Sequence, residues 1–275
     1  MPANPGRSAR AARLTVIGLP PLIAAMCSRF TLTASPAETA ALLGLGCVEP
    51  FPPRYNIAPA QPILVCLGGA EDRPDAGRPG RTSLLVRWGL IPGWVKDLKG
   101  FPLLFNATAE MAAEKNAFRA ALRYRRCLVP ASGWYEWSRD GRGRKKQAFF
   151  MKPRTVGPIA FAGLMETWLS PDGSEIDTAA ILTTAASAAL APVRDRMPVV
   201  LDPADFARWL DCRTYDADGV DDLLRPAPDR LIEAVPVSDR VNRIADTSPE
   251  IQAPLAPAPP PGDKTRDHPD QASLF

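Results

Sequence analysis

The stretch IAAMCSRFTLT (residues 23–33) places Cys27 directly after a methionine. As an internal residue its nitrogen is an amide, and an isolated cysteine is most often a small buried apolar side chain. If translation starts at Met26, the initiator methionine is removed ahead of so small a residue, and Cys27 becomes the amino terminus. It then carries an amine and a thiol that titrate near about 8 and about 8.5 in model peptides, so both are partly nucleophilic near neutral pH.

A terminal cysteine supports two kinds of chemistry. Its amine condenses with an aldehyde to an imine, and the thiolate then closes on the imine carbon to give a five-membered thiazolidine. Alternatively, it acts as an N-terminal nucleophile that cleaves amide bonds, including one in its own chain. In both cases nothing can remain attached to the nitrogen of Cys27. Either Met26 is the true start, which we favour, or the leader is cleaved, in one version by the protein itself.

The remaining composition narrows the chemistry further. Five widely spaced cysteines without a CxxC pair disfavour a disulfide framework and a zinc site, and they fit a reducing cytoplasm. The single histidine, His268, lies in a Pro-rich tail, so proton transfer in the folded part must use carboxylates, amines, thiols or water. We expect no metal, no cofactor and no membrane span. The segment LTVIGLPPLIAA (14–25) faintly resembles a signal peptide, but two prolines interrupt it, so export is the minor alternative.

Charge is concentrated in one part of the chain. The net charge of +3 does not by itself imply a nucleic-acid partner. Between Arg119 and Lys146, however, nine basic residues accompany two acidic ones. This stretch could contact phosphates, and its segment 139–146, which includes Arg144, could equally be a solvated hairpin loop.

The segments that must position these residues alternate between strand and helix signals. Ser35, Pro36 and Glu38 form a capping box that predicts a helix through Leu43, and Asp202 before Pro203 predicts another. Short apolar or alternating runs predict strands between them: ILVCL, SLLVRWGL, RCLVPASGWYEW, QAFFM, IAFAGLMETW and TAAILTT. Many strands with few helices predict a mixed α+β fold, a barrel-like curved β-sheet with flanking helices. The Pro-rich segment 247–275 is predicted to be disordered.

Eight sequence blocks occur in an order that resembles the SOS response-associated peptidase (SRAP) family. They are MCSRF, RYNIAPAQ, RWGLIPGWVKD, FNATAE, RRCLVPASGWYEW, FAGLMETW, TTAASAALAPVRDRMPVVL and VSDRVN. The resemblance implies one SRAP-like domain over 26–246, with residues 1–25 as a leader absent from the mature protein. It also implies a protein that senses abasic sites in single-stranded DNA, crosslinks to the sugar aldehyde through a thiazolidine at Cys27, and has weak lyase activity.

The resemblance further implies roles for individual residues. Asn106 would hold the terminal cysteine and the lesion, although without its block a turn or capping asparagine would be the simpler interpretation. Glu136 would shuttle protons during imine formation, against the alternative of a surface carboxylate. Arg29 would neutralise a DNA phosphate, and Trp94 would stack on a base, although a lone tryptophan is more often part of a core.

Two positions depart from the family pattern. Arg194 replaces a histidine thought to exchange protons during ring opening and crosslink reversal, which arginine cannot do at neutral pH. We therefore expect Arg194 to hold a phosphate or to orient Glu136, with slow reversal. Thr108 replaces an arginine, so DNA binding should lose about one counterion of salt dependence. These losses leave open a degenerate, non-catalytic single-stranded DNA-binding module.

The chain ends in QASLF (271–275), which resembles the peptide that docks repair proteins on the bacterial β sliding clamp. Gln271 would occupy the rim of the clamp pocket, and Leu274 and Phe275 would fill it. An arbitrary terminus is the alternative. The sequence therefore predicts two partners, single-stranded DNA with abasic sites and the clamp.

Overall fold

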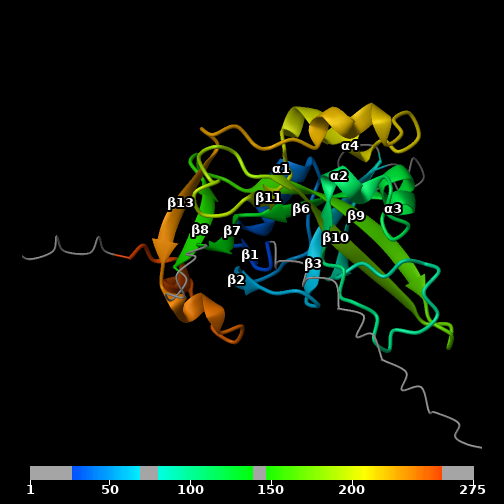
Figure 1. Cartoon of the computed structure of the whole chain (residues 1–275), viewed down its shortest axis with the longest axis horizontal. Helices are drawn as coiled ribbons and strands as arrows, with labels where there is room; N and C mark the ends of the chain where they lie inside the picture. Colours follow the sequence, from blue (N-terminus) through cyan, green and yellow to red (C-terminus); the bar gives the residue numbers. More distant parts are fainter. Residues whose placement is uncertain (1–26, 69–79, 139–146, 256–275) are drawn as a thin grey trace, which may run out of the picture.

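A computed structural model describes residues 27–68, 80–138 and 147–255 (Figure 1). The helices in these ranges are α1 (Pro36–Leu43), α2 (Ala109–Ala112), α3 (Arg119–Tyr124) and α4 (Phe206–Leu210), and the 3-10 helices are η1 (Pro203–Asp205), η2 (Asp218–Leu223), η3 (Asp239–Asn242) and η4 (Pro249–Gln252). The strands are β1 (Phe30–Leu32), β2 (Arg54–Ile57), β3 (Pro62–Gly68), β4 (Arg81–Trp88), β5 (Asn106–Thr108), β6 (Arg126–Ala131), β7 (Gly133–Trp137), β8 (Ala148–Pro153), β9 (Ile159–Leu169), β10 (Glu175–Ala185), β11 (Arg196–Pro198), β12 (Val200–Leu201) and β13 (Ile232–Val237).

Five strands of the larger sheet close into a barrel. Within the described ranges the order is β4-β3-β6-β9-β10, and β10 returns to pair with β4 in parallel. β5 adds in parallel to β10, β11 pairs with β10, and β12 pairs with β9. Because parallel and antiparallel pairs are mixed, this is the α+β barrel-like sheet that the sequence predicts.

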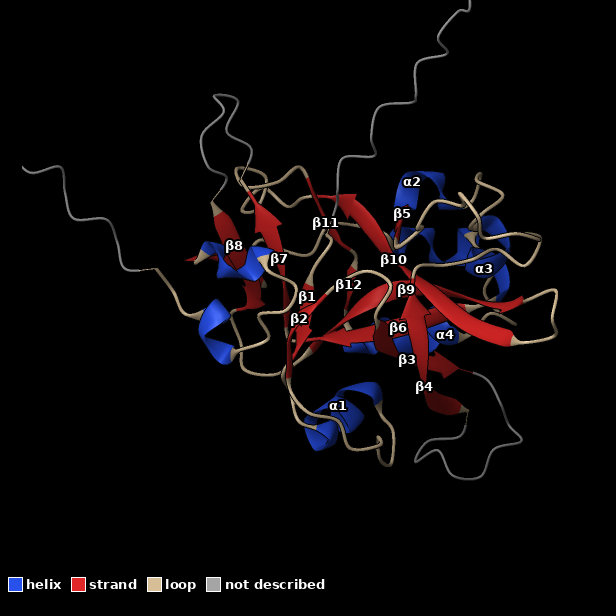
Figure 2. Ribbon diagram, turned by 90° about the horizontal axis from the view of Figure 1, so that it is seen from below, coloured by secondary structure: helices blue, strands red, loops and turns tan. Residues whose placement is uncertain are grey.

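A second sheet covers one end of the barrel. Its order in the described chain is β13-β8-β7-β1-β2, with antiparallel neighbours throughout. Figure 2 shows β8, β7, β1 and β2 on the left of β6, β9 and β10. Phe30, Ile57 and Trp134 of this sheet share one buried cluster with the barrel interior. Both sheets therefore contribute side chains to the cluster inside the barrel.

The alternation of side chains along the barrel strands separates two apolar layers. Ile63 and Val65 of β3 point into the barrel, whereas Cys66 packs in the layer beneath the helices. α1, α3 and α4 contribute Leu43, Leu122 and Trp209 to that outer layer. The helices thus cover the outside of the barrel.

The local helix signals are confirmed. Ser35 caps α1 in a complete capping box with Glu38, and Gly44 ends the helix with φ +65°. Asp202 caps η1, which continues into α4. Among the described helices none is long and apolar enough to cross a membrane.

The folded part extends beyond the boundary expected at residue 247. η4 lies past this point, Ile251 is buried, and Pro254 bridges to Val237. The proline-rich composition of the whole tail predicts disorder, but one buried isoleucine and a few backbone hydrogen bonds are enough to fix this short segment.

Candidate active site

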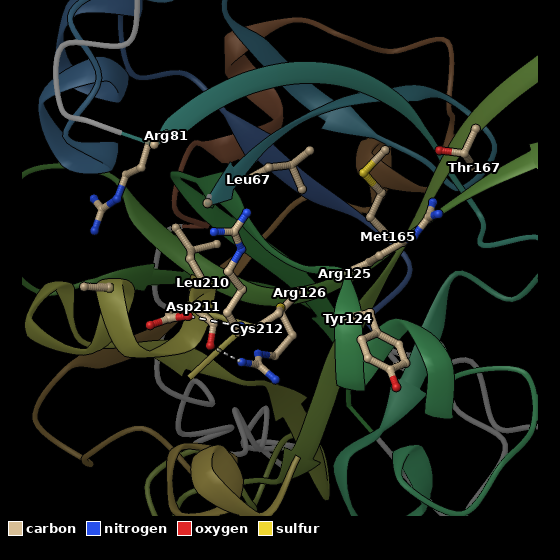
Figure 3. A pocket seen from close by; sticks show the side chains of 14 residues that line it. Leu67, Arg81, Tyr124, Arg125, Arg126, Met165, Thr167, Leu210, Asp211 and Cys212 are labelled. Carbon is tan, nitrogen blue, oxygen red and sulfur yellow. Dashed lines mark hydrogen bonds between the residues drawn. The ribbon is translucent and has the colours of Figure 1, made fainter. Parts of the chain in front are cut away.

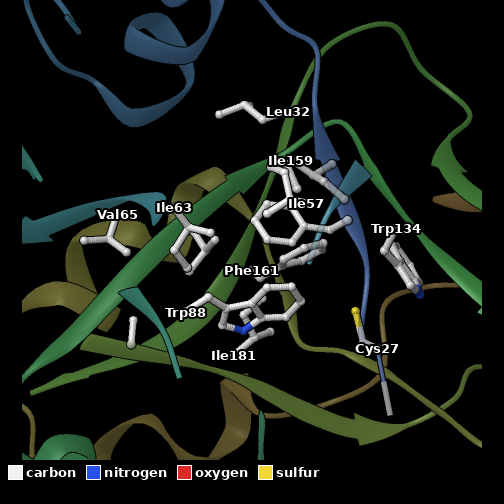
Figure 4. Close-up of a cluster of buried hydrophobic side chains, with 14 of the residues drawn as sticks. Cys27, Leu32, Ile57, Ile63, Val65, Trp88, Trp134, Ile159, Phe161 and Ile181 are labelled. Atoms are coloured by element: carbon white, nitrogen blue, oxygen red, sulfur yellow. The ribbon is translucent and has the colours of Figure 1, made fainter. Parts of the chain in front are cut away.

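Cys27 lies at the covered end of the barrel, three residues before Phe30, the first residue of β1. Its side chain is 1% exposed and belongs to the barrel core, with Trp134 nearby in Figure 4. β1 pairs with β2 on one side and β7 on the other, so the short segment after Cys27 is held between two strands. This pairing fixes where the nitrogen of Cys27 can point.

The carboxylate of Glu136 accepts a hydrogen bond from that nitrogen. The backbone N–H of Cys27 donates to Glu136 Oε1 at 3.1 Å, and the glutamate is 2% exposed. Residues two apart on a strand share a face, so Glu136 of β7 points to the same side as Trp134, while Tyr135 packs in a separate cluster. The carboxylate is therefore buried by its place in the strand.

Asn106 holds the other side of Cys27. Its side-chain Nδ2 donates to the carbonyl oxygen of Cys27 at 3.1 Å. Asn106 begins β5, where it lies opposite Ile181 of β10. Two segments far apart in sequence, β5 and β7, thus hold the backbone N–H and carbonyl of one cysteine.

Arg194 completes the group. Its Nε lies 3.7 Å from Glu136 Oε2 and 4.0 Å from Asp195 Oδ1, and its side chain is largely buried. Arg194 precedes β11 in a turn in which its backbone N–H donates to Leu190. The structure therefore brings together the four residues that were predicted to be catalytic.

The electrostatics around Cys27 favour a neutral thiol. Burial raises the pKa of the Cys27 thiol well above its ordinary value, and the negative charge of Glu136 raises it further, against a smaller opposing effect of the Arg29 backbone N–H. A buried thiol next to a carboxylate needs a proton acceptor before it can attack. Glu136 is the carboxylate whose charge acts on this thiol, and it accepts the N–H of the same residue.

The predicted DNA-contact residues lie in different settings. Arg29 is half-buried, and its Nη1 donates to Asn56 Oδ1 at 3.0 Å and to the Val241 carbonyl at 2.9 Å. Trp94 is 61% exposed and meets Phe101 edge-on, so one ring is accessible at the surface. Thr108 ends β5 and precedes α2 without a side-chain capping bond. Arg144 and the terminal residues Gln271, Leu274 and Phe275 lie outside the described residues.

Asn56 is a buried residue that the sequence alone does not single out. Its Nδ2 donates to three carbonyls in the segment after β13, those of Val241, Arg243 and Asp246. Together with Arg29 it ties this segment to the strand after Cys27. A polar residue in the otherwise strand-like run RYNI was the available signal.

A cavity of about 800 Å³ lies away from Cys27, between β3, β9 and the ends of α3 and α4 (Figure 3). Its lining includes Arg81, Arg125 and Arg126, but the protein itself occupies donors of each. Arg81 donates to the Leu43 carbonyl, Arg125 pairs with Glu166, and Arg126 donates to backbone carbonyls. None of the predicted catalytic residues lines it.

In the described ranges no group of histidine, cysteine and carboxylate side chains could hold a metal ion.

Comparisons with known proteins agree on one family. The family described as SOS response associated peptidase (SRAP) matches residues 26–244. Abasic site processing protein YoqW of Bacillus subtilis (strain 168) is 35% identical over 229 residues, covering 82% of this chain and 98% of that protein. Abasic site processing protein HMCES of Rattus norvegicus is 28% identical over 235 residues, covering 75% and 66%.

A crystal structure of a protein from Bacteroides thetaiotaomicron has the same fold, with a TM-score of 0.73 at 21% identity over 84% of this chain and all of that one. The family match begins at Met26, directly before the cysteine around which the buried polar groups converge. The chain belongs to the SOS response associated peptidase family.

Proposed function

We propose that this protein recognises abasic sites in single-stranded DNA and links itself to them covalently through Cys27. The observation that carries the proposal is the contact of Glu136 with the Cys27 nitrogen, together with the Asn106 bond to the Cys27 carbonyl. These contacts hold the backbone nitrogen and the carbonyl oxygen of Cys27, and the nitrogen becomes the reactive amine when Cys27 is the N-terminal residue. The names of the relatives, abasic site processing proteins, supply the substrate class.

The reaction follows from the positions of these groups. The free amine of Cys27 attacks the aldehyde carbon of the ring-opened sugar, and Glu136 accepts a proton from the nitrogen. Glu136 then returns a proton to the leaving hydroxyl, so water departs and an imine forms. The thiol adds to the imine carbon while its proton passes to the imine nitrogen. One C–N and one C–S bond form, and one water molecule leaves.

The same contact supports removal of a leader. When Cys27 is internal, its nitrogen is the leaving group of the bond to Met26. The Cys27 thiol would give its proton to Glu136, and Glu136, which accepts the Cys27 N–H, would pass that proton to the departing nitrogen. Attack by the Cys27 thiol on the preceding carbonyl would transfer the acyl group to sulfur, and water would release it. Initiation at Met26 would reach the same terminus without this step.

The decisive experiment combines mass and reactivity. We expect the protein made from its native gene to begin at Cys27, by intact mass and N-terminal sequencing. It should then form a denaturation-resistant adduct with single-stranded DNA that carries an abasic site. Cys27→Ala should abolish the adduct, and Glu136→Gln should slow its formation by about 10²-fold or more.

Two outcomes would contradict this proposal. A blocked or extended N-terminus without adduct would remove the reactive amine. Equal binding of intact and abasic single strands without adduct would favour the alternative of a non-catalytic DNA-binding module, which the replacements at Arg194 and Thr108 keep open. Exposed Cys47→Ala is the matched control and should leave the adduct unchanged.

A further inference from the structure

We propose that the indole N–H of Trp134 donates a hydrogen bond to the oxygen on C1′ of the abasic sugar, the atom that becomes the aldehyde oxygen when the ring opens. Trp134 is 0% exposed, and its Nε1 has no acceptor within hydrogen-bond distance among the described residues. Buried polar groups in native proteins are nearly always hydrogen-bonded, so this donor calls for an acceptor that a ligand supplies. The inference rests on the proposed crosslinking function.

Strand β7 places this N–H next to Cys27. Trp134 and Glu136 stand two residues apart on β7, so their side chains share a face, and Glu136 accepts the Cys27 N–H. Trp134 and Cys27 also belong to the same buried cluster. Figure 4 shows the Trp134 ring beside Cys27, with its nitrogen at the lower end of the ring, level with Cys27.

Packing holds the ring without using its N–H. Trp134 lies opposite Phe30 in the pairing of β1 with β7. Its ring meets that of Phe161 edge-on, with the centroids 5.8 Å apart and the planes at 82°. The direction of the N–H is therefore set before a ligand arrives. A donor fixed in this way stabilises charge that develops in a reaction without having to reorient.

The other buried tryptophans differ from Trp134 in this respect. Within the described ranges each gives its N–H to a backbone carbonyl: Trp88 to Phe105 at 2.8 Å, Trp168 to Val95 at 2.6 Å, and Trp209 to Cys127 at 2.8 Å. Tryptophans that serve the core of this fold thus have an acceptor inside the protein. The exception is the tryptophan beside the candidate nucleophile.

The proposed reaction creates a suitable acceptor. When the Cys27 amine attacks the aldehyde carbon, a C–N bond forms and the π electrons of the C=O bond move to the oxygen, which becomes negative. Glu136 takes a proton from the nitrogen and returns it to this oxygen, which finally leaves as water. Until that return, the ionised carboxylate has no proton with which to stabilise the oxygen. The Trp134 N–H can do so while keeping its own proton.

Replacing the N–H alone tests this role. Benzothienylalanine at position 134 keeps the two-ring shape and has sulfur in place of the N–H. The crosslinking rate at saturating abasic single-stranded DNA should fall about ten-fold or more, since loss of one oxyanion donor costs about 10²–10³-fold in acyl transfer. The urea unfolding midpoint should not fall, because the removed N–H has no acceptor among the described residues. Trp134→Phe is a second variant without the N–H, and its rate should fall as well.

The same replacement at Trp209 is the matched control. Trp209 lies in the outer apolar layer, and its N–H donates to the Cys127 carbonyl. Benzothienylalanine there should lower the unfolding midpoint and leave the crosslinking rate within about two-fold. A rate within about two-fold of native for the position-134 replacement would overturn the inference. So would an equal fall of the midpoint at both positions, because the Trp134 N–H would then be structural.

A spectroscopic measurement identifies the acceptor. In a Cys27→Ala background, which prevents the adduct, the ¹H–¹⁵N signal of the Trp134 indole can be assigned by its loss in Trp134→Phe. It should move further downfield with single-stranded DNA that carries a natural abasic site than with the tetrahydrofuran analogue, which lacks the oxygen on C1′. Equal movement with the two strands, or no movement with either, would refute a contact with this oxygen.

The outcomes also separate this inference from the proposed function. If the native protein forms no adduct, the proposed function itself fails. If the adduct depends on Cys27 and Glu136 but forms at the native rate without the Trp134 N–H, only the role of Trp134 fails.

Discussion

At the scale of the residue, the protonation chemistry near Cys27 depends on which neighbours can exchange a proton. Glu136 can, whereas Arg194, 3.7 Å from it, remains a fixed cation at any physiological pH. In the proposed mechanism Glu136 is therefore the proton-transfer group, and a histidine at position 194 would provide a further one. This difference should affect reversal most, because release needs protonation of the thiazolidine sulfur or nitrogen.

Arg194→His should speed crosslink release by at least about ten-fold, since a positioned acid–base group contributes about 10²–10⁴-fold in favourable cases. Release would be measured by chasing a preformed adduct with excess unlabelled abasic DNA. Arg194→Lys keeps the charge without a group that titrates near neutral pH and is the control. Equal release from the native protein and Arg194→His would refute the role assigned to this position.

The Cys27 thiol gives a second prediction at this scale, through the pH dependence of its alkylation. Because burial and Glu136 raise its pKa, the rate should increase only at pH values above the ordinary midpoint of about 8.5. The negative charge of Glu136 disfavours the thiolate. Glu136→Gln removes this charge, so the midpoint of the alkylation profile should move to lower pH. Iodoacetamide labelling with peptide mass spectrometry would measure it, with exposed Cys47 as an internal reference. An unchanged midpoint would mean that Glu136 does not act on the sulfur.

At the scale of the element, Arg126 of β6 joins strand and helices on the outside of the barrel. The side chain is 1% exposed, and its guanidinium donates to main-chain carbonyls at the ends of α3 and α4 and in the loop after α4: Leu122, Trp209, Asp211, Tyr215 and Asp216. Carbonyls at helix C-termini favour a cation. Arg126 therefore adds donors at the C-terminal ends of α3 and α4, beyond the single backbone hydrogen bond that each C-cap residue makes.

Arg126→Lys should lower the free energy of unfolding by about 3 kcal/mol or more. A lysine cannot reach all of these carbonyls, and each buried acceptor left without a donor costs about 1–3 kcal/mol. Urea unfolding would show a lower midpoint at an unchanged m-value. Arg154→Lys, in an exposed pair with Glu233, should change stability by less than about 1 kcal/mol. Similar losses in both variants would contradict the structural role of Arg126.

Elements with strong local signals could be predicted from the sequence, and those defined by distant partners could not. The capping box fixes α1 through hydrogen bonds within four residues, so Ser35 and Glu38 suffice to place it. β5 has three residues with no periodicity, and its existence depends on pairing with β10.

The convergence of Cys27, Asn106 and Glu136 was expected only through the family resemblance. The internal bonds of Arg29 depend on a segment more than 200 residues away, which explains why the sequence pointed to phosphate alone.

At the scale of the whole molecule, the QASLF motif (271–275) predicts binding to the β sliding clamp. Deleting residues 271–275 should abolish binding to purified β sliding clamp while leaving crosslinking to abasic DNA unchanged. A pull-down and an adduct assay on the same preparation would measure both. Ser273→Ala, which leaves Gln271, Leu274 and Phe275 in place, is the control. Absence of affinity between the intact protein and the clamp would refute this partner.

The burial of Cys27 also bears on selectivity among aldehydes. A free 1,2-aminothiol reacts with any small aldehyde in the cell, and an exposed one would soon be consumed by metabolites. Cys27 is 1% exposed, and Glu136 and Asn106 hold its backbone, so small aldehydes in solution have little access to it. An aldehyde must first bind to the protein for long enough that the residues around Cys27 move and expose it. Under the proposed function, this burial would protect the Cys27 amine and thiol from free aldehydes until the aldehyde of a bound abasic site reaches them.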